Sequence, residues 1–486
     1  MRVGLPPSKK QSLYRRTLKT MATTTAQTAI CNIPNRTIFE GDNLDVMRGM
    51  NDGCIDLIYL DPPFNSNRDY AAPIGSKAAG AAFKDTWDLT DVDEAWHNEI
   101  AEADLALYKI IDASQYSHGS GMKSYLIMMA VRMLEMRRIL KATGSIYLHC
   151  DGTASHYLKA LMDAVFGRRN FRNEVTWKRT SSHNDAARNY SSITDNLLFY
   201  TKSDQFTFQT QHTPYSEEHI ANSYRYVDEN NRRYATRDLR SPSPRPNLTY
   251  DYKGYKPHSN GWSVSLERMK QLDAEGRLHF PRSKDGRIRL KRYLDEMPGV
   301  PAANIWDDIK PVQSQAQERL GYPTQKPLAL LERIIQASSN EGEVVLDPFC
   351  GCATTCIAAE RLGRLWIGID LSPMAVRLVE QRARNELGLM GGVQAIARSD
   401  IPMRTDREPP PPLRESKVVL YGTQGGNCNG CGNHFLPQNF TIDHIIATVK
   451  GGTDHIENLQ LLCGYCNSLK GDRPMEYLRA RLVRAV

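Results

Sequence analysis

The sequence lacks several features that would mark broad classes of protein. No run of eighteen or more apolar residues occurs among its 486 residues, so no membrane span is expected. No secretory signal precedes its ten cysteines, which favours reduced thiols and a cytoplasmic location. Residues 1–39 contain seven lysines and arginines but no aspartate or glutamate. The net charge of +7 is therefore distributed unevenly along the chain.

The basic amino-terminal stretch, residues 1–34, has three alternative explanations. Its composition resembles that of a transit peptide, because it is rich in Ser, Thr and Arg and has no acids. It could equally be a disordered DNA-binding arm. Met21 offers a second start, so the stretch could also precede the true beginning of the protein. We expect this extension to be disordered and assign it no function.

Alternating strand and helix patterns predict a doubly wound α/β sheet in two parts, residues 35–205 and residues 311–400. Residues 206–310 lose this alternation and are expected to form an inserted irregular domain. Residues 401–417 contain four consecutive prolines and are expected to be an extended linker before a compact module at 418–486. The predicted strands are 37–40, 55–60, 145–149, 174–177, 196–200, 344–346 and 365–369, and the predicted helices are 123–140, 155–166, 327–337, 354–361 and 374–386.

Residues 221–300 of the inserted segment combine surplus positive charge with aromatic side chains. They contain seventeen Lys and Arg against ten Asp and Glu, with seven tyrosines interleaved. This composition predicts a polyanion partner, with cations on phosphates and aromatic rings on bases or sugars. A solvated basic surface with no partner is the alternative.

The tetrapeptide Asp61-Pro62-Pro63-Phe64 follows the apolar run 55–60, which is typical of a buried parallel strand. Two consecutive prolines fix φ and remove two backbone donors, so the local carbonyls stay free to accept hydrogen bonds. Asp61 and a backbone carbonyl could therefore hold an exocyclic amino group while Phe64 packs on the base. An amine held in this way keeps its lone pair ready to attack an electrophile. The alternative is a proline-rich turn without chemistry.

The segment 347–355, with the sequence Asp-Pro-Phe-Cys-Gly-Cys-Ala-Thr-Thr, lies between a predicted strand and a predicted helix. Its small residues let the backbone turn tightly and approach a ligand. Asp370 ends the next predicted strand about twenty residues later, where an acid can accept from two ribose hydroxyls. The segment lacks the GxGxxG pattern, which disfavours a pyrophosphate ligand. A nucleoside such as S-adenosylmethionine fits better.

Together these motifs resemble the β-class of amino DNA methyltransferases, in which the catalytic motif precedes the cofactor motif. The likeness covers about residues 36–390 and includes five motifs in the permuted order. The segment 61–64 is similar to motif IV, 347–355 to motif I, Asp370 to motif II, Gly41-Asp42 to the acidic motif III, and 322–327 to motif X.

The resemblance implies a Rossmann-like fold, S-adenosylmethionine as cofactor and double-stranded DNA as partner, with the target base flipped out of the helix. Aspartate at position 61 is more typical of enzymes that modify N6 of adenine than of those that modify N4 of cytosine, so adenine is favoured. Residues 206–310 correspond to the target-recognition region. Ala353 departs from the family, which commonly has glycine there. The implied cofactor-binding residues are Asp42, Thr324, Lys326, Asp347, Phe349, Gly351, Thr354 and Asp370.

The carboxyl-terminal module contains two CxxC pairs, which is a metal-binding pattern. Four thiolates at this spacing predict a structural zinc site. We expect His434 and His455 to be surface residues, because four cysteines already satisfy a zinc ion. The predicted zinc ligands are Cys428, Cys431, Cys463 and Cys466.

Asp443-His444, Asn458 and Asn467 resemble the HNH nuclease family and its small ββα-metal fold, with fourteen residues from His444 to Asn458 and nine more to Asn467. The resemblance implies that Asp443 and Asn467 supply oxygen ligands to one Mg²⁺ or Mn²⁺. His444 would take a proton from water. Asn458 is expected to brace the loop that holds His444. The alternative is a zinc ribbon that only binds DNA.

Three hypotheses follow for the whole chain. The first combines adenine methylation and DNA cleavage, as in a single-chain restriction–modification enzyme of a prokaryote or phage, with a homodimer as an open possibility. The second is a DNA methyltransferase, acting on adenine or cytosine, whose zinc module only binds DNA. The third, methyl transfer to protein or RNA, is disfavoured, because protein-glutamine methyltransferases carry Asn in place of Asp61 and need no inserted basic domain.

Overall fold

The computed structural model forms two compact units, Thr210–Ala303 and the remainder of the chain. Parts of four predicted features lie outside the described residues. They are residues 1–29 of the amino-terminal extension, Pro323 of the predicted motif X, three prolines of the predicted linker (409–411) and the end of the helix predicted at 374–386. The described residues are 30–64, 68–71, 82–85, 100, 104–181, 190–313, 315–316, 318–322, 324–382, 384, 394–407, 412–450 and 452–483.

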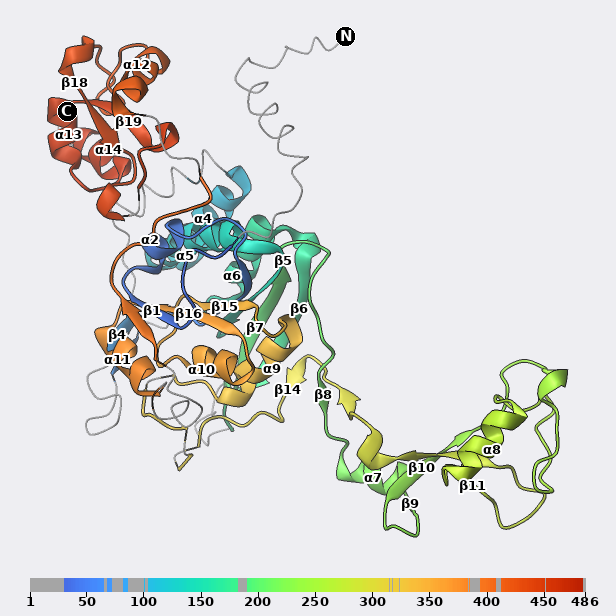
Figure 1. The fold of residues 1–486 in the computed structure, drawn as a ribbon. Helices are drawn as coiled ribbons and strands as arrows, with labels where there is room; N and C mark the ends of the chain where they lie inside the picture. Colours follow the sequence, from blue (N-terminus) through green and yellow to red (C-terminus); the bar gives the residue numbers. More distant parts are fainter. Residues whose placement is uncertain are drawn as a thin grey trace. The chain divides into compact units, whose positions relative to one another are not determined.

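A nine-stranded sheet forms the centre of the larger unit (Figure 1). Its strands are β1 (Thr37–Glu40), β2 (Ile55–Leu60), β5 (Leu140–Cys150), β6 (Phe171–Lys178), β7 (Thr194–Thr201), β14 (Ile305–Trp306), β15 (Val344–Asp347), β16 (Leu365–Asp370) and β17 (Ile396–Arg398). Their order is β14-β6-β7-β5-β2-β15-β16-β1-β17. Neighbouring strands are parallel except at β7, which is antiparallel to both β5 and β6. A smaller hairpin joins β3 (Arg68–Ala71) and β4 (Ala82–Asp85).

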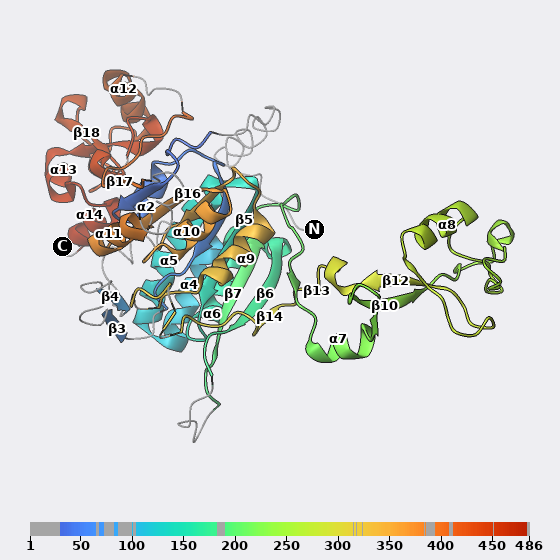
Figure 2. The same ribbon diagram turned by 60° about the horizontal axis from the view of Figure 1, so that its bottom comes forward.

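Helices cover both faces of this sheet (Figure 2). On one face lie α2 (Asn43–Arg48), α4 (Leu105–His118), α5 (Ser120–Ile139) and α6 (Ser155–Met162), and on the other lie α9 (Leu328–Ser338), α10 (Thr354–Arg361) and α11 (Pro373–Arg382). Each face has its own apolar cluster. Because both faces are covered, β2 is buried at all six positions, which explains why its residues are apolar except for Asp56, which pairs with Lys141 at 2.8 Å. The predicted doubly wound α/β fold is confirmed.

The predicted elements agree with the observed ones, with small shifts at their ends. Strands 37–40 and 55–60 and helix 354–361 have the predicted ends. The strand predicted at 145–149 is longer and begins at Leu140. The helix predicted at 155–166 ends as an α-helix at Met162 and continues as a π-helical turn, Asp163–Gly167.

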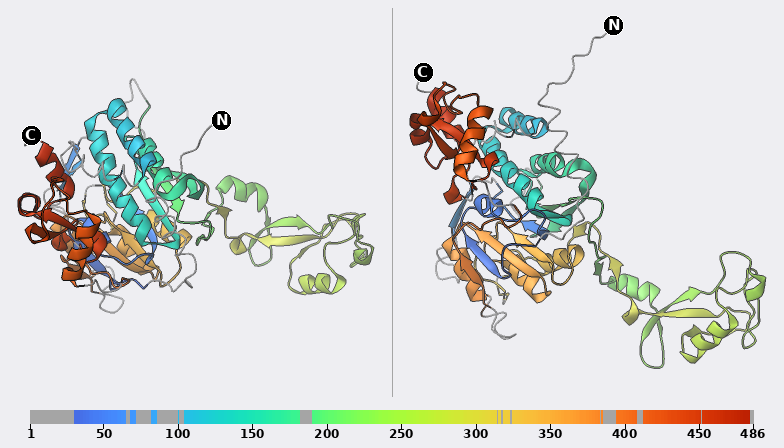
Figure 3. Two further views of the ribbon diagram at one scale, coloured as in Figure 1. Left: turned by 90° about the horizontal axis from the view of Figure 1, so that it is seen from above. Right: turned by 45° about the horizontal axis from the view of Figure 1, so that its top comes forward.

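The unit Thr210–Ala303 contains helices and an antiparallel sheet, so the prediction of a domain without regular secondary structure is wrong (Figure 3). It packs around a core that includes Trp262, Met269 and Ile288. Its strands escaped prediction because they are short and their exposed positions carry charges instead of an alternating apolar pattern. It contains α7 (Glu217–Ser223), α8 (Leu266–Ala274), an antiparallel sheet of β11 (Leu278–His279), β12 (Arg289–Tyr293), β10 (Arg233–Asp238) and β9 (Tyr226–Val227), and the pair β8 (His212–Thr213) and β13 (Val300–Pro301).

The carboxyl-terminal residues form a small ββα module with its own apolar cluster. It consists of α12 (Leu413–Thr423), the antiparallel strands β18 (Phe440–His444) and β19 (Leu459–Cys463), α13 (Gly464–Lys470) and α14 (Met475–Val483). The extended linker predicted as far as 417 is wrong, because α12 already begins at Leu413. Pro412 can precede this helix, since the first helical turn needs no hydrogen bond from a backbone N–H. None of the described helices is long and apolar enough to cross a membrane.

Candidate functional site

Asp61 stands directly after β2 and is the centre of the candidate active site. Its Oδ2 accepts a hydrogen bond from Lys326 Nζ at 2.5 Å. Its Oδ1 is buried and accepts no hydrogen bond from any residue that the structure describes. Leaving a buried carboxylate oxygen unpaired is costly, so this atom is suited to accept from a bound ligand. Pro62 beside it is buried, whereas Pro63 and Phe64 are half-buried.

Lys326 links the predicted motif X to this corner. Its side chain is only 9% exposed, and its ammonium lies 5.4 Å from the centre of the Phe64 ring. The same ammonium donates to the carbonyl of Thr324 at 3.4 Å. Thr324 has φ +61°, a left-handed conformation that is uncommon for a residue with a side chain and is often found at functional sites. The structure therefore brings Thr324 and Lys326 together with Asp61.

The predicted cofactor loop follows β15 and encloses the buried carboxyl of Asp347. Asp347 accepts hydrogen bonds from Thr355 Oγ1 at 2.5 Å and from the Phe349 backbone N–H at 3.1 Å. Burial outweighs these hydrogen bonds and raises the pKa of Asp347 to about 7. Phe349 packs, half-buried, against the apolar cluster under α5. Through these two hydrogen bonds, the buried Asp347 carboxyl fixes the shape of the loop.

Replacing Asp347 with asparagine should make stability less dependent on pH. A carboxyl whose pKa is raised on folding stabilises the fold below its unfolded pKa, near 4, and loses that contribution as pH rises through the folded value of about 7. The free energy of unfolding of the wild type should fall across this range, by on the order of 4 kcal/mol at most from this group. Denaturant titrations of both proteins at several pH values measure the difference. Identical pH dependence in the two proteins would contradict it.

The turn of the loop depends on two left-handed residues. Gly351 has φ +49°, and a Cβ there would approach Tyr322 Cε1 to 3.0 Å, so the loop packs directly on motif X. Ala353 has φ +57° at the start of α10. A left-handed conformation costs an L-residue about 1 kcal/mol, which explains why glycine is the common residue at this position in the family that the sequence resembles. Ala353 tolerates it with the smallest possible side chain.

Asp370 ends β16 and holds the loop from the neighbouring strand. Its Oδ2 accepts from the Gly351 N–H at 2.8 Å and its Oδ1 from the Ser372 N–H at 2.8 Å. Burial raises the pKa of Asp370. Each oxygen keeps a further lone pair, so both can still accept from a ligand hydroxyl. Thr354, in contrast, is buried, and its hydroxyl accepts from Arg382 Nη1 at 3.2 Å.

Asp42 is held by a residue that the sequence did not indicate. Its Oδ1 caps α2 through the Leu44 N–H at 2.9 Å, and its two oxygens accept from Arg132 Nη2 at 2.7 and 3.0 Å. The next residue, Asn43, donates to the Pro348 carbonyl at 2.6 Å and so connects α2 to the cofactor loop. Arg132 is a buried cation on α5, a signal that could have drawn attention to it.

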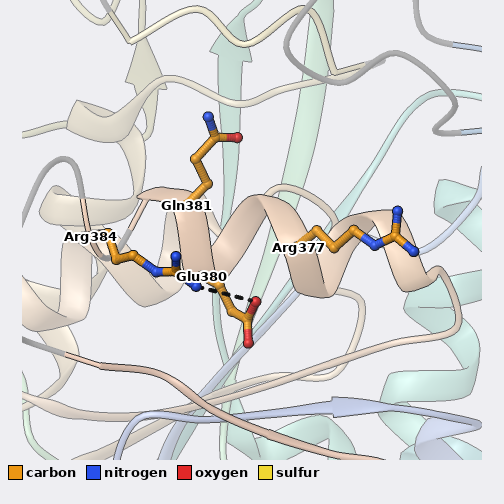
Figure 4. Close-up of a pocket in the computed structure, with 4 residues that line it drawn as sticks. All are labelled: Arg377, Glu380, Gln381 and Arg384. Atoms are coloured by element: carbon orange, nitrogen blue, oxygen red, sulfur yellow. Dashed lines mark ion pairs between the residues drawn. The ribbon is translucent and has the colours of Figure 1, made fainter.

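A hollow on α11 carries none of the predicted site residues (Figure 4). It is lined by Arg377, Glu380, Gln381 and Arg384, and the last of these pairs with Glu380 at 3.8 Å. All four side chains are polar and come from one helical stretch. The hollow therefore lacks the apolar wall expected of a nucleoside site.

The four predicted zinc ligands converge in the carboxyl-terminal module. The sulfur atoms of Cys428, Cys431, Cys463 and Cys466 all lie within 4.8 Å of one another. A tetrahedral site with Zn–S bonds of about 2.3 Å requires sulfur atoms about 3.8 Å apart, so this cluster needs little change to hold zinc.

Replacing Cys463 with serine should release zinc and unfold the module without affecting the sheet unit. The module has a small apolar cluster of its own, and structural zinc in such modules supplies much of the folding free energy. Metal analysis should find about one zinc ion per wild-type chain and less in the variant. Loss of one of two calorimetric transitions would accompany it. A variant that keeps both zinc and transition would contradict this role, and Cys54→Ser, at a buried cysteine of the sheet unit, is the control.

The predicted nuclease residues gather around the β18–β19 hairpin and α13. His444 Nε2 lies 2.6 Å from Asp454 Oδ1. Asn458 accepts from the Ile446 N–H at 2.9 Å and donates to the carbonyls of Ile446 and Thr453, at 3.1 and 2.8 Å, so it braces the loop after His444.

Asp443 is occupied by protein donors. Lys470 Nζ lies 3.1 Å from both of its oxygens and donates to the His444 carbonyl at 2.7 Å, and Gln460 Nε2 donates to Oδ2 at 2.7 Å. Asn467 precedes Lys470 by three positions on α13 and therefore shares the helix face that turns toward Asp443. The ammonium of Lys470 therefore lies on the carboxylate that is predicted to bind the metal.

A doubly wound sheet whose carboxyl-terminal edge carries Asp61-Pro62-Pro63-Phe64 beside a turn over Asp347 defines the class of amino methyltransferases. The family model for DNA methylases that modify N6 or N4 amino groups matches residues 55–381, about two thirds of the chain. The chain belongs to this DNA methylase family. A second model, for HNH endonucleases, matches residues 428–473.

Bacterial restriction–modification proteins are among the relatives. The Type II methyltransferase M.EcaI of Enterobacter cloacae is 30% identical over 72% of this chain and 69% of its own length. The StyLTI Mod subunit of a Type III restriction-modification enzyme from Salmonella typhimurium is 28% identical over 66% of this chain, which spans only about half (49%) of that relative. The DNA adenine methyltransferase YhdJ of Escherichia coli is 23% identical, over 71% of this chain and 81% of its own length.

Among solved structures, an M1.HpyAVI–SAM complex overlaps 71% of this chain and 98% of its own, with 14% identity and a TM-score of 0.33. The PvuII DNA methyltransferase, described as cytosine-N4-specific, overlaps 71% and 85%, with 14% identity and a TM-score of 0.32. Scores this low have no bearing on the choice of base.

Proposed function

We propose that this chain transfers a methyl group from S-adenosylmethionine to the N6 amino group of adenine in duplex DNA, after the base has left the helix. The observation that supports this most is the buried Asp61 Oδ1, which accepts no hydrogen bond from the described residues. An amino group donates two hydrogen bonds, and Asp61 with a carbonyl of the proline pair can accept both. Phe64 offers a ring on which the base can stack.

The residues around β15 and β16 fit a nucleoside cofactor. A Cβ added at Gly41 would meet nothing within 4 Å, so space is open beside Asp42. Asp370 can accept from hydroxyl groups, and the loop lacks the GxGxxG pattern of a pyrophosphate site. When bound, S-adenosylmethionine supplies an electrophilic methyl group. We assign its binding to Asp42, Thr324, Lys326, Asp347, Phe349, Gly351, Thr354 and Asp370.

The chain's own residues would orient the amine and stabilise its charge. With its N–H groups held by acceptors, the amine keeps its lone pair directed away from Asp61. Lys326 fixes the Asp61 carboxylate through Oδ2 and leaves Oδ1 for the base. As the amine gains positive charge during transfer, the adjacent carboxylate stabilises it in a site that burial has removed from water. After the transfer the methylated amine loses a proton, which the adjacent Asp61 carboxylate can accept.

The unit Thr210–Ala303 is suited to bind the DNA backbone. It contains seventeen Lys and Arg and twelve Asp and Glu. Four of these cations, Arg232, Lys253, Arg268 and Arg277, pair with a carboxylate. The other thirteen make no ion pair with a described residue, which leaves them available for phosphates.

We propose further that the carboxyl-terminal module is an HNH endonuclease, so that the chain acts as a single-chain restriction–modification enzyme in the cytoplasm of a prokaryote or phage host. His444 would take a proton from water, and Asp443 with Asn467 would hold Mg²⁺ or Mn²⁺. Among the described residues, Oδ1 of Asp443 accepts only from Lys470, so this oxygen keeps one lone pair that can face a metal ion. The Lys470 ammonium on the same carboxylate favours the second candidate, a zinc module that only binds DNA.

One experiment tests both activities. Unmodified plasmid is incubated with the full chain, with and without S-adenosylmethionine and Mg²⁺, and single molecules are then sequenced for modified bases and new ends. Methylated adenine in one sequence context is expected, with cleavage only when Mg²⁺ is present. Methylation without any cleavage would support the DNA-binding module, and methylated cytosine would overturn the choice of adenine.

A further inference from the structure

His149 lies beside the segment Asp61–Phe64, although it belongs to none of the sequence motifs described above. It is the last residue but one of β5, next to β2 in the sheet. The register pairs Leu148 with Leu60, so His149 is level with Asp61, one residue further along. Its side chain is 0% exposed. A histidine buried this completely needs partners for both ring nitrogens.

Both nitrogens of His149 are held. Nδ1 lies 2.9 Å from the Tyr59 hydroxyl, and Nε2 lies 3.1 Å from Asp195 Oδ2. Asp195 also pairs with Arg179 Nε at 3.0 Å. Burial alone would raise the pKa of Asp195, but the hydrogen bond from His149 and the charges of Lys326 and Arg179 outweigh it and hold that pKa below its ordinary value. An ionised Asp195 only accepts, so Nε2 of His149 carries a hydrogen and donates it to this carboxylate.

The ring held in this way supports Phe64. The two rings stack, with their centres 6.1 Å apart and their planes 20° from parallel. Trp177 and His149 form a T-shaped pair, with their ring centres 5.9 Å apart and their planes at 84°. Phe64 is half-buried, and the Lys326 ammonium lies 5.4 Å from the centre of its ring. With two hydrogen bonds and an aromatic wall, the orientation of His149 is fixed in every direction.

We propose that His149 is a positioning residue for base binding, because it supports one face of Phe64 and so presents the opposite face to the extruded base. This inference rests on the proposed methyl transfer to a flipped base. The rings of His149 and Phe64 and the base would form three stacked layers, beside the free Oδ1 of Asp61. The alternative is a core histidine that only satisfies Tyr59 and Asp195.

The experiment begins by mapping the methylated position with the wild-type chain. A fluorescent analogue, 2-aminopurine for adenine or pyrrolocytosine for cytosine, is then placed at that position in a duplex. Base extrusion is followed by the fluorescence of this duplex. Methyl transfer is followed by its single-turnover rate on the unmodified duplex, and the affinity for S-adenosylmethionine is measured alongside. The variants are His149→Leu, which removes the aromatic plane, and His149→Phe, which restores it. Tyr147→Phe is the matched control, because it loses an equally buried hydrogen bond, to Ser338 at 2.8 Å, on the same strand face.

For His149→Leu we expect the transfer rate to fall about tenfold, in line with the value of one base–aromatic stack, together with a weaker fluorescence change. S-adenosylmethionine affinity should match that of Tyr147→Phe, and His149→Phe should recover part of both losses. Unchanged fluorescence and rate in a folded His149→Leu would overturn the proposal, as would an equal loss in Tyr147→Phe.

If His149→Leu does not fold, Tyr59→Phe replaces it, since it keeps the His149 ring and removes one of its two hydrogen bonds. A loss of about threefold is expected there, and no loss would overturn the proposal. The wild-type mapping step judges the proposed function separately. Methyl transfer to cytosine would overturn the choice of adenine and leave the His149 comparison valid.

Discussion

Asp61→Ala is expected to reduce methyl transfer about a thousandfold or more while leaving S-adenosylmethionine binding nearly unchanged. The variant removes Oδ1, a buried carboxylate oxygen that accepts no hydrogen bond from the described residues and can accept one from the target amine. The cofactor loop is held by other groups, chiefly Asp347 and Asp370, so its shape should survive. Incorporation of labelled methyl groups into DNA measures the first effect, and calorimetric titration with S-adenosylmethionine measures the second.

The control must separate lost chemistry from a disturbed fold, because Asp61→Ala leaves the buried Lys326 without its carboxylate. Asp61→Ala combined with Lys326→Met removes both charges and should restore stability but not methyl transfer. Asp61→Asn keeps the size and one acceptor, and should retain more activity than alanine. Recovery of methyl transfer in the double variant would show that Asp61 acts only as a partner for Lys326.

His444→Ala is expected to abolish DNA cleavage, with a loss of about a hundredfold to ten-thousandfold, and to leave methylation intact. His444 of β18 is the residue that we propose takes a proton from water, and its Nε2 lies 2.6 Å from Asp454 Oδ1. Its module has its own apolar cluster and its own cysteine site, so the variant should not disturb the sheet. Nicking of plasmid in Mg²⁺ or Mn²⁺ measures cleavage, and resistance to a methylation-sensitive nuclease measures methylation.

Two comparisons give this result its meaning. Asp454→Asn should weaken cleavage less than His444→Ala, because the imidazole remains. Substitution of His455, which contacts Thr453 and is not expected to act in catalysis, should have little effect. Loss of both activities in His444→Ala would argue against separable sites. Full cleavage in that variant would remove His444 from the mechanism.

The catalytic corner was predictable from the sequence because its parts are local. A mostly apolar run fixes β2, which ends at Leu60, just before Asp61 and the two prolines. Carboxyl ends of parallel strands share one edge of a sheet, so Asp61, Asp347 and Asp370 had to meet there once the strands were recognised. The two CxxC pairs were equally local and predicted the four-sulfur cluster.

The supporting residues were not predictable, because their partners are remote. Arg132 and Asp42 are 90 positions apart, and His149 and Asp195 are 46 apart. A buried arginine or histidine on an apolar element gives no sequence signal for which carboxylate it meets. Lys326 was assigned to the cofactor, and its contact with Asp61, 265 positions away, emerged only in the fold.

The prediction for the unit Thr210–Ala303 was wrong for a different reason. Its sheet is narrow and its strands hold two to six residues, too few for a period to be recognised. Its core relies on large aromatic side chains such as Trp262 instead of an alternating pattern. The positive charge of this unit therefore predicts a polyanion partner, whereas its sequence pattern did not predict its fold.

The two ends of that unit meet as a strand pair, with Thr213 opposite Val300 and His212 opposite Pro301. Paired strands lie about 5 Å apart, so the segment between these two strands begins and ends at nearly the same place. Recombination could replace this segment as one cassette without altering any strand of the nine-stranded sheet. If methylation and cleavage both depend on this cassette, a lineage that acquires a new one changes the sequence it attacks and the sequence it protects together. A host would then inherit a new specificity without a generation in which its own DNA is unmethylated at the new sequence and open to cleavage.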